Sequence, residues 1–141
     1  MNSVSQATTG VDELRALLLA GQRFRQAMAD HFGLSLSETV LLGHLADSAE
    51  PLSPGVVAER MLLGTGTVTA VIDRLVQGGY AARRAHPEDR RRVRIQLTPA
   101  GRRVIRYVQR HMERAIRAGG ASSLRPLAAA LDAETDRVLS R

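Results

Sequence analysis

Hydrophobic residues recur at three- and four-residue spacings over residues 11–32, the pattern of an amphipathic helix with one apolar stripe. Asp12 and Glu13 stand at its start, where carboxylates interact favourably with the helix dipole, and Gly33 can end it. The preceding residues 1–10 are polar, so we expect them to be disordered. The stripe consists of Leu14, Leu17, Leu18, Gly21, Phe24, Met28 and Phe32.

Two shorter helices follow, and each is opened by a capping pattern. Ser35 and Glu38 form a capping-box pair, which predicts a helix from this point to about Ala46. Ser53 stands before a proline, the arrangement of an N-cap followed by a first helical position that needs no N–H donor. It predicts a helix over residues 53–61, joined to the earlier helix by a short extended piece.

A further helix is predicted over residues 65–77 and is ended by the pair Gly78-Gly79. At about 100° per residue, its hydrophobic side chains cluster on one side, which we expect to pack on the preceding helix. The hydrophobic side contains Val68, Val71, Ile72 and Leu75, and its expected partners are Val57, Ala58 and Met61. The other side contains Gly66, Thr67, Ala70, Asp73 and Arg74, with Thr65 and Thr69 at its flanks.

A basic β-hairpin is predicted directly after this helix. The stretch His86-Pro87-Glu88-Asp89 is rich in turn-forming residues, because proline presets one turn position and aspartate can bond its own backbone. Beyond it, hydrophobic and polar residues alternate over 93–97, which is typical of a half-buried strand. The tip of the hairpin carries Arg90, Arg91 and Arg92.

The last part of the chain predicts two helices with unpartnered apolar stripes. Thr98-Pro99 is again a cap followed by proline, and a second helical segment follows near the end. The small domain formed by the preceding helices and the hairpin has no room for both stripes, so we expect these segments and the first helix to form a symmetric dimer interface. The alternative is that they pack on their own monomer. The stripes contain Val104, Ile105, Val108, Met112, Ala115 and Ile116, then Leu124, Leu127, Leu131, Val138 and Leu139.

Charge is concentrated in one part of the chain. The 20 basic and 14 acidic residues give a net charge of +6, but residues 80–117 alone hold 12 arginines and three acids. The remainder has eight basic and 11 acidic residues, so a basic zone lies on a mildly acidic body. Such a footprint favours a nucleic-acid partner. For residues 102–117 taken alone, a solvated basic helix face is the alternative.

Composition excludes several classes of chemistry. The chain has no cysteine, hence no disulfide or thiolate metal site, and no lysine, hence no Schiff base or P-loop lysine. Its four histidines lack metal-ligand spacing, and no nucleophile elbow is present. We therefore expect no enzyme activity, no metal and no cofactor. Without a membrane-length apolar run or a signal sequence, we expect a cytoplasmic protein.

Two short helices followed by a basic hairpin make a winged helix-turn-helix, and the motifs resemble the MarR family of transcriptional regulators. The run Leu63 to Leu75 with Gly78-Gly79-Tyr80 is similar to that family's recognition helix. The wing pattern, an Asp-x-Arg followed by a strand and Thr-x-x-Gly, is matched by Asp89, Arg91, Leu97, Thr98 and Gly101. The resemblance spans roughly residues 11–118. It implies a mainly α fold with a small β-hairpin wing and dimerisation helices at both ends.

The expected division of the chain is one domain over residues 11–141. Residues 34–97 are the expected DNA-binding lobe, and residues 11–32 and 98–141 are the expected dimerisation helices. The N-terminal turn of a recognition helix enters the major groove, where threonine hydroxyls and close-approaching glycines can contact phosphates and base edges. The residues expected to bind DNA are Ser53, Thr65, Gly66, Thr67, Thr69, Ala70, Arg74, Arg90, Arg91 and Arg92.

The resemblance also implies roles within the wing. Asp89 would pair with Arg91 and stabilise the wing loop, while Arg90 or Arg92 reaches the groove. Ala70 departs from the family, since many relatives have a longer polar or basic side chain there that reads bases. Specificity is therefore expected to depend more on the wing and on DNA shape.

The sequence thus predicts a dimeric, sequence-specific double-stranded DNA-binding regulator, a repressor relieved by a small-molecule effector. Its operator would be pseudo-palindromic, with half-sites about 10 base pairs apart or a multiple of this. The resemblance implies an effector between the dimerisation helices and the DNA-binding lobe, but its identity and its contact residues are unknown. The alternatives are a winged helix that binds an acidic protein, or a non-specific DNA-binding protein without an effector.

Overall fold

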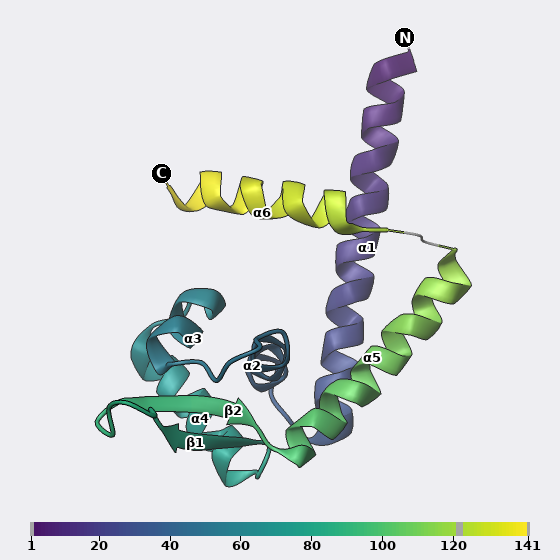
Figure 1. Cartoon of the computed structure of the whole chain (residues 1–141). Coiled ribbons are helices and arrows are strands. Elements are labelled where there is room, and N and C mark those ends of the chain that lie inside the picture. The colour runs from purple at the N-terminus through teal and green to yellow at the C-terminus, as the bar shows by residue number, and fades with distance from the viewer. Residues whose placement is uncertain (1, 121–122, 141) are drawn as a thin grey trace. The chain divides into compact units, whose positions relative to one another are not determined.

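The computed structural model describes residues 2–120 and 123–140, and their side chains from Thr9 onward. It is mainly α-helical with one two-stranded antiparallel sheet, as the sequence predicts (Figure 1). The elements are α1 (Asn2–Phe32), α2 (Leu36–Ala46), α3 (Pro54–Met61), α4 (Thr65–Gln77), β1 (Ala81–Ala85), β2 (Val93–Leu97), α5 (Pro99–Gly119) and α6 (Arg125–Leu139). The chain divides into two compact units, Met1–Arg106 and Tyr107–Arg141.

The N-terminal helix is longer than the sequence predicts. Helix α1 begins at Asn2, nine positions before the start predicted at residue 11, and residue 1 lies outside the described part. The segment contains no proline, and extending an existing helix gains one hydrogen bond for each residue fixed. Its polar composition therefore does not stop a helix that the apolar stripe has already nucleated.

The predicted helix caps of α2 and α3 are confirmed. The N–H of Glu38 donates to Oγ of Ser35 over 3.2 Å, and the N–H of Ser35 donates to Oε2 of Glu38 over 2.6 Å. At α3, Oγ of Ser53 accepts from the N–H of Val56 over 3.3 Å. These bonds satisfy amide groups that the helices themselves leave without partners. Both starting points are thereby fixed by the local sequence.

Helices α2, α3 and α4 enclose one hydrophobic core together with the sheet. The predicted apolar side of α4 is fully buried, and Val57 and Ala58 of α3 are buried beside it. Between α3 and α4, Leu62 adopts a left-handed conformation with φ of 54°, which makes the turn between them tight. The core consists of Leu41, Leu42, Leu45, Leu52, Val57, Ala58, Val68, Val71, Ile72, Leu75, Ala81, Ile95, Leu97 and Val104.

The hairpin is attached to the core at its base. Strands β1 and β2 pair in register from Ala81 opposite Leu97 to Ala85 opposite Val93. The short extended piece before α3 adds a bridge, because Leu52 and Ile95 exchange both backbone hydrogen bonds, over 2.9 Å and 2.7 Å. Burial falls along the strands towards the tip, where Val93 is exposed although the alternation places it on the buried face of the strand. The tip therefore projects beyond the core.

A close backbone approach fixes the start of α5. Oγ1 of Thr98 accepts from the N–H of Gly101 over 3.1 Å and donates to the carbonyl of Gly79 over 2.6 Å. A Cβ at Gly101 would lie only 2.1 Å from the carbonyl oxygen of Tyr80. Glycine is therefore required here, and the Thr-x-x-Gly pattern anchors α5 to the chain between α4 and β1.

The second unit contains the remainder of α5 and helix α6. In α6, every described residue is at least partly exposed to solvent. Within the described residues, no single helix is long and apolar enough to cross a membrane. The bent pair α3 and α4 passes that test only when taken together, and these helices supply much of the core described above.

Candidate nucleic-acid interface

The outward side of α4 carries short side chains on a helix whose other side is buried. The five residues predicted near its N-terminus are all exposed, namely Thr65, Gly66, Thr67, Thr69 and Ala70. The N-cap is Gly64, which makes no side-chain cap bond, so the first amide groups of α4 face outward without a side-chain acceptor. A helix N-terminus with free amides and small residues permits close approach of a phosphate backbone.

Arg74 is tied to α2 by an ion pair that the sequence does not predict. Its Nε donates to Oε1 of Glu38 on α2 over 2.8 Å, forming an ion pair. The Glu38 side chain is 7% exposed, whereas that of Arg74 is 52% exposed. The guanidinium therefore joins α4 to α2 and still presents part of its surface to solvent.

Glu38 is a buried carboxylate with a hydrogen-bond donor at each of its two oxygens. Burial by itself would raise the pKa of Glu38, but the N–H of Ser35 and the guanidinium of Arg74 donate to the carboxylate. These donors outweigh burial and hold the pKa of Glu38 below its usual value. Glu38, which closes the capping box of α2, thus also positions α4.

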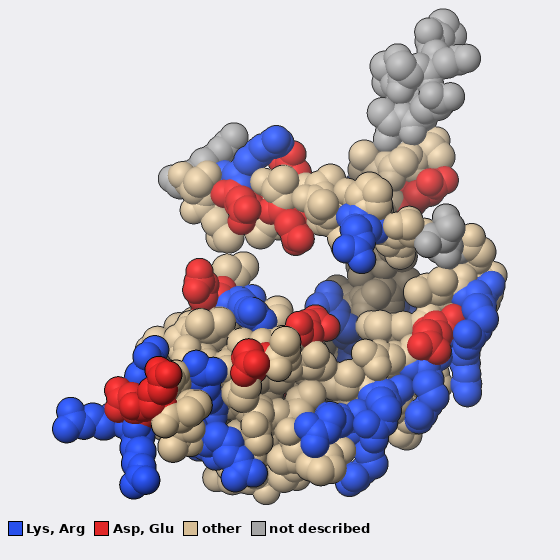
Figure 2. Space-filling model, viewed as in Figure 1, with Lys and Arg blue, Asp and Glu red and all other residues tan. Residues whose placement is uncertain are grey.

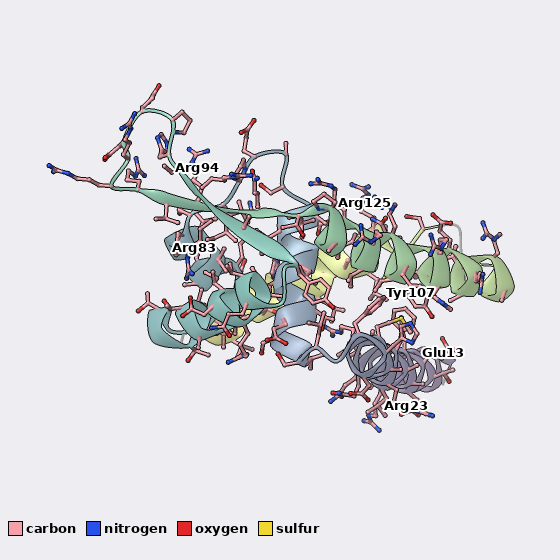
Figure 3. The ribbon with its side chains drawn as sticks, turned by 90° about the horizontal axis from the view of Figure 1, so that it is seen from below. Glu13, Arg23, Arg83, Arg94, Tyr107 and Arg125 are labelled. Carbon is pink, nitrogen blue, oxygen red and sulfur yellow. The ribbon has the colours of Figure 1, made fainter. Side chains whose placement is uncertain are left out.

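A second ion pair joins α4 to the hairpin. Nη2 of Arg83 on β1 lies 2.5 Å from Oδ1 of Asp73, and both side chains are partly exposed. Arg83 is labelled in Figure 3. Because one pair ties α4 to α2 and the other ties it to β1, the helix is braced on both sides of its exposed face. An exposed pair adds little stability by itself. Its geometric effect is to fix the hairpin relative to α4.

The hairpin tip carries the densest exposed positive charge of the lobe. Arg90, Arg91 and Arg92 are all exposed, and the blue side chains at the tip extend away from the body in Figure 2. The tip is closed by a hydrogen bond of 2.8 Å from the N–H of His86 to the carbonyl of Arg92. Residues 86–92 therefore form an outward-pointing loop.

Asp89 stabilises this loop through the backbone. Its Oδ1 accepts from the N–H of Arg91 over 3.0 Å, and its carbonyl accepts from the N–H of Arg92 over 3.0 Å. The sequence resemblance implies a pairing of Asp89 with Arg91. The bond in the structure runs from the backbone amide of Arg91 to the aspartate, and the side chain of Arg91 is exposed.

His86 and Arg94 brace the base of the tip. Nη2 of Arg94 lies 2.8 Å from Nε2 of His86, while Nδ1 of His86 lies 3.2 Å from the N–H of Glu88. Beside them a groove of about 380 Å³ separates the hairpin from the start of α3. Ser53 and Arg92 both line this groove, so the structure brings together one predicted residue of α3 and one of the wing.

Sequence reasoning misses the partners that hold the site in place. It identifies Glu38 only as a capping residue, and 36 positions separate it from Arg74, so no spacing rule connects the two. Asp73 and Arg83 are only ten positions apart across the Gly78-Gly79 turn. Their opposite charges on either side of a predicted helix-to-strand turn are a signal that could have found this pair.

Comparison with known proteins gives a family match and relatives. The MarR family model matches residues 32–92. YcgE of Bacillus subtilis (strain 168), an uncharacterized HTH-type transcriptional regulator, is 36% identical over 98 residues, which are 70% of this chain and 63% of YcgE. The HTH-type transcriptional repressor YetL of the same organism is 33% identical over 84 residues, 58% of this chain and 50% of YetL. The matches thus span one half to two thirds of these relatives' length.

Solved structures show the same fold. A mutant of MepR from S. aureus, bound to an oligodeoxyribonucleotide, has a TM-score of 0.68 at 16% identity, with 92% of this chain and 95% of that chain covered. The names of the relatives are those of transcriptional regulators and not of enzymes, as the sequence predicts. Residues 32–92 of this chain are thus similar to the MarR family, its relatives bear the names of transcriptional regulators, and the chain shares its fold with the solved MepR structure.

Proposed function

We propose that this protein is a cytoplasmic transcriptional regulator that binds a specific double-stranded DNA operator as a dimer, and that it is a repressor relieved by a small-molecule effector. The observation that carries the proposal is the combination of a braced helix, α4, with small exposed residues and an arginine-tipped hairpin on the same lobe. The regulator names of YcgE and YetL and the DNA-bound state of MepR support it.

The two elements suit different parts of a duplex. Helix α4 offers hydroxyls, small side chains and free N-terminal amides, which fit the major groove and its flanking phosphates. The hairpin offers three flexible guanidinium groups, which fit the phosphate backbone or a narrow minor groove. In this proposal Thr65, Gly66, Thr67, Thr69 and Ala70 lie along the major groove, and the wing arginines determine much of the affinity.

Exposed apolar surface on the helices outside the lobe supports dimerisation. Leu17, Leu18 and Leu19 of α1 are about half exposed, as are Met112 and Ile116 of α5. In α6, Val138 is 71% exposed and Leu139 60% exposed. So much unpaired apolar surface on one chain is typical of a protein–protein interface. A twofold axis would place two α4 helices on successive turns of one duplex face.

In this proposal, the effector acts by shifting the dimer from one arrangement to another. A ligand relieves repression only if it binds more tightly to the spacing of the α4 helices that does not fit the operator. No residue is assigned to effector binding.

Selection of genomic fragments by the purified full-length protein, followed by footprinting, tests the proposal. The expected result is enrichment of a pseudo-palindrome with half-sites about 10 base pairs apart or a multiple of this, bound by a species of twice the chain's mass in sedimentation equilibrium. For about six neutralised phosphates, the logarithm of affinity should fall with the logarithm of salt concentration with a slope near −5. Equal, weak binding of all duplexes, or a monomer on the operator, would overturn it.

A further inference from the structure

Helix α5 carries a second basic surface, which is separate from α4 and from the wing. At about 100° per residue, all six arginines of α5 fall within an arc of about 120° around the helix axis. We call this surface the arginine face, and it consists of Arg102, Arg103, Arg106, Arg110, Arg114 and Arg117. Figure 2 shows basic side chains in a row along α5. Glu113 is the single acidic residue within the arc, so the face has a net charge of +5.

The hydrophobic residues of α5 lie on the opposite side of the helix. Gly101 and Val104 are buried, and Val108 is partly buried, whereas all six residues of the arginine face are exposed. A dimer formed through the apolar side would leave the arginine face in solvent. The arginine face is therefore available to a partner in both the monomer and the proposed dimer.

Most of these guanidinium groups have no acidic partner. Within the described residues, Arg103, Arg106, Arg114 and Arg117 make no ion pair. Arg110 lies over the ring of Tyr107, at 5.8 Å from its centroid, and Nη1 of Arg102 donates to the carbonyl of Leu97 over 3.0 Å. Six like charges on one helix face repel each other, at i,i+4 spacings above all, and this cost calls for a compensating partner.

We propose that the arginine face binds phosphates of the operator duplex outside the segment that α4 and the wing contact. From Arg102 to Arg117 the helix rises about 22 Å, which matches about six phosphates along one strand at 3.4 Å per base pair. All the positive charges of the face are guanidinium groups, which form bidentate bonds with phosphate. This inference rests on the proposed function and extends its footprint.

The structure favours DNA over the other polyanions. A helix that lies on an anionic membrane must insert its own apolar face, and in the first turns of α5 that face is already buried, with Val104 only 2% exposed. Arg103 and Arg106 also belong to the same compact unit as α4 and the hairpin. Duplex DNA already present at that unit would meet these charges at high local concentration.

The test compares two duplexes and two triple variants of the full-length protein. One duplex ends at the borders of the footprint, and the other carries about 15 further base pairs on each side, roughly the 22 Å reach of α5 with a margin. The variant R106Q/R110Q/R114Q removes three of the six positive charges of the face, and glutamine keeps most of the helix propensity of arginine. The control R15Q/R23Q/R25Q makes the same charge change on exposed positions of α1.

The expected result is that the flanking base pairs raise the affinity for the duplex, and that only the face variant shows a reduced gain. The wild type and the α1 control should bind the longer duplex at least tenfold more tightly, with a salt slope steeper by about 5 for six phosphates. In the R106Q/R110Q/R114Q variant this gain in affinity should be much smaller and the increase in salt slope about half as large, because Arg102, Arg103 and Arg117 remain. If that variant does not fold, R114Q/R117Q provides the same comparison with two charges.

Three outcomes would overturn the inference. In the first, the wild type binds both duplexes equally. In the second, the variant gains as much affinity from the flanking base pairs as the wild type does. In the third, the flanking base pairs add no affinity, and the wild type binds anionic phosphatidylserine vesicles more tightly than the variant does. In each of these the short operator duplex is still bound, so the proposed function stands. If no duplex is preferred by sequence, the proposed function fails and this inference fails with it.

Discussion

Helix α4 and the hairpin wing are neighbours on one lobe, but they are held in opposite ways. Helix α4 has its apolar side in the core and is tied to α2 and β1 by the Glu38–Arg74 and Asp73–Arg83 ion pairs. The wing tip has no buried residue and is held by short-range hydrogen bonds within the loop. The candidate DNA-contacting side chains differ in the same way. Those near the N-terminus of α4 are short and uncharged, and those of the wing are long and charged.

Under the proposed function, this difference predicts that α4 and the wing make different kinds of contact with DNA. Short side chains on a rigid helix can make contacts only where the duplex comes close, so their contribution depends on fit and sequence. Long guanidinium side chains on an exposed loop reach phosphates in many geometries, so they contribute affinity that depends on salt more than on sequence. Changes in the wing and changes around α4 should therefore have different signatures.

The largest expected effect comes from removing the wing charge. In R90Q/R91Q/R92Q, operator affinity should fall at least tenfold and the salt slope should become shallower by about 2.7. The free energy of unfolding should change by less than about 0.5 kcal/mol, because these side chains are exposed. Anisotropy titrations at several salt concentrations, together with urea unfolding, measure both. A large loss of stability would show that the wing arginines are structural.

Local signals in the sequence predict the elements of the lobe closely. The caps at Ser35 and Ser53 and the helix over residues 65–77 match the structure, because each depends on residues within about four positions. The predicted start of α1 is wrong, because a polar composition does not itself end a helix. Thus elements with explicit start and stop residues are predictable, and an end without them is not.

The candidate site is predictable only in part, for a related reason. Helical periodicity correctly separates the exposed side of α4 from its buried side. The partners that brace α4 come from distant parts of the chain, as with Glu38 and Arg74, and one sequence carries no rule for such pairs. The DNA contacts of the exposed residues stay a prediction.

A smaller effect is expected from loosening α4 without touching the wing. In E38Q the charge-assisted bonds to Arg74 and Ser35 become neutral, and the free energy of unfolding should fall by about 2 kcal/mol. Half-exposed Arg74 can be resolvated, which limits the loss. Because sequence-dependent contacts depend on the rigidity of α4, discrimination between operator and random duplex should decrease more than the salt slope. Urea unfolding and paired anisotropy titrations on the two duplexes measure these changes.

The pH dependence of stability gives a separate test of Glu38. Its pKa in the folded protein is lowered, so its contribution is fully present above the unfolded pKa, near 4.5, and is lost as pH falls through the folded pKa. The wild type should therefore lose stability on acidification in this range, and E38Q should lose less. Urea unfolding at a series of acidic to neutral pH values measures the difference. Parallel curves for the two proteins would contradict the role assigned to Glu38.

The smallest effect is expected from the single side-chain bond inside the wing tip. D89A removes the acceptor for the N–H of Arg91, while D89N removes the same charge and keeps an oxygen in that place. Both variants reduce repulsion of phosphate equally, so their difference isolates the hydrogen bond, worth about 1 kcal/mol. Operator affinity of D89A should therefore be a few-fold below that of D89N. Amide hydrogen exchange at Arg91 should be faster in D89A. Equal affinities and equal exchange would mean that the backbone bonds from His86 and Arg92 suffice to shape the tip, and that a loop without any buried residue needs no side-chain brace.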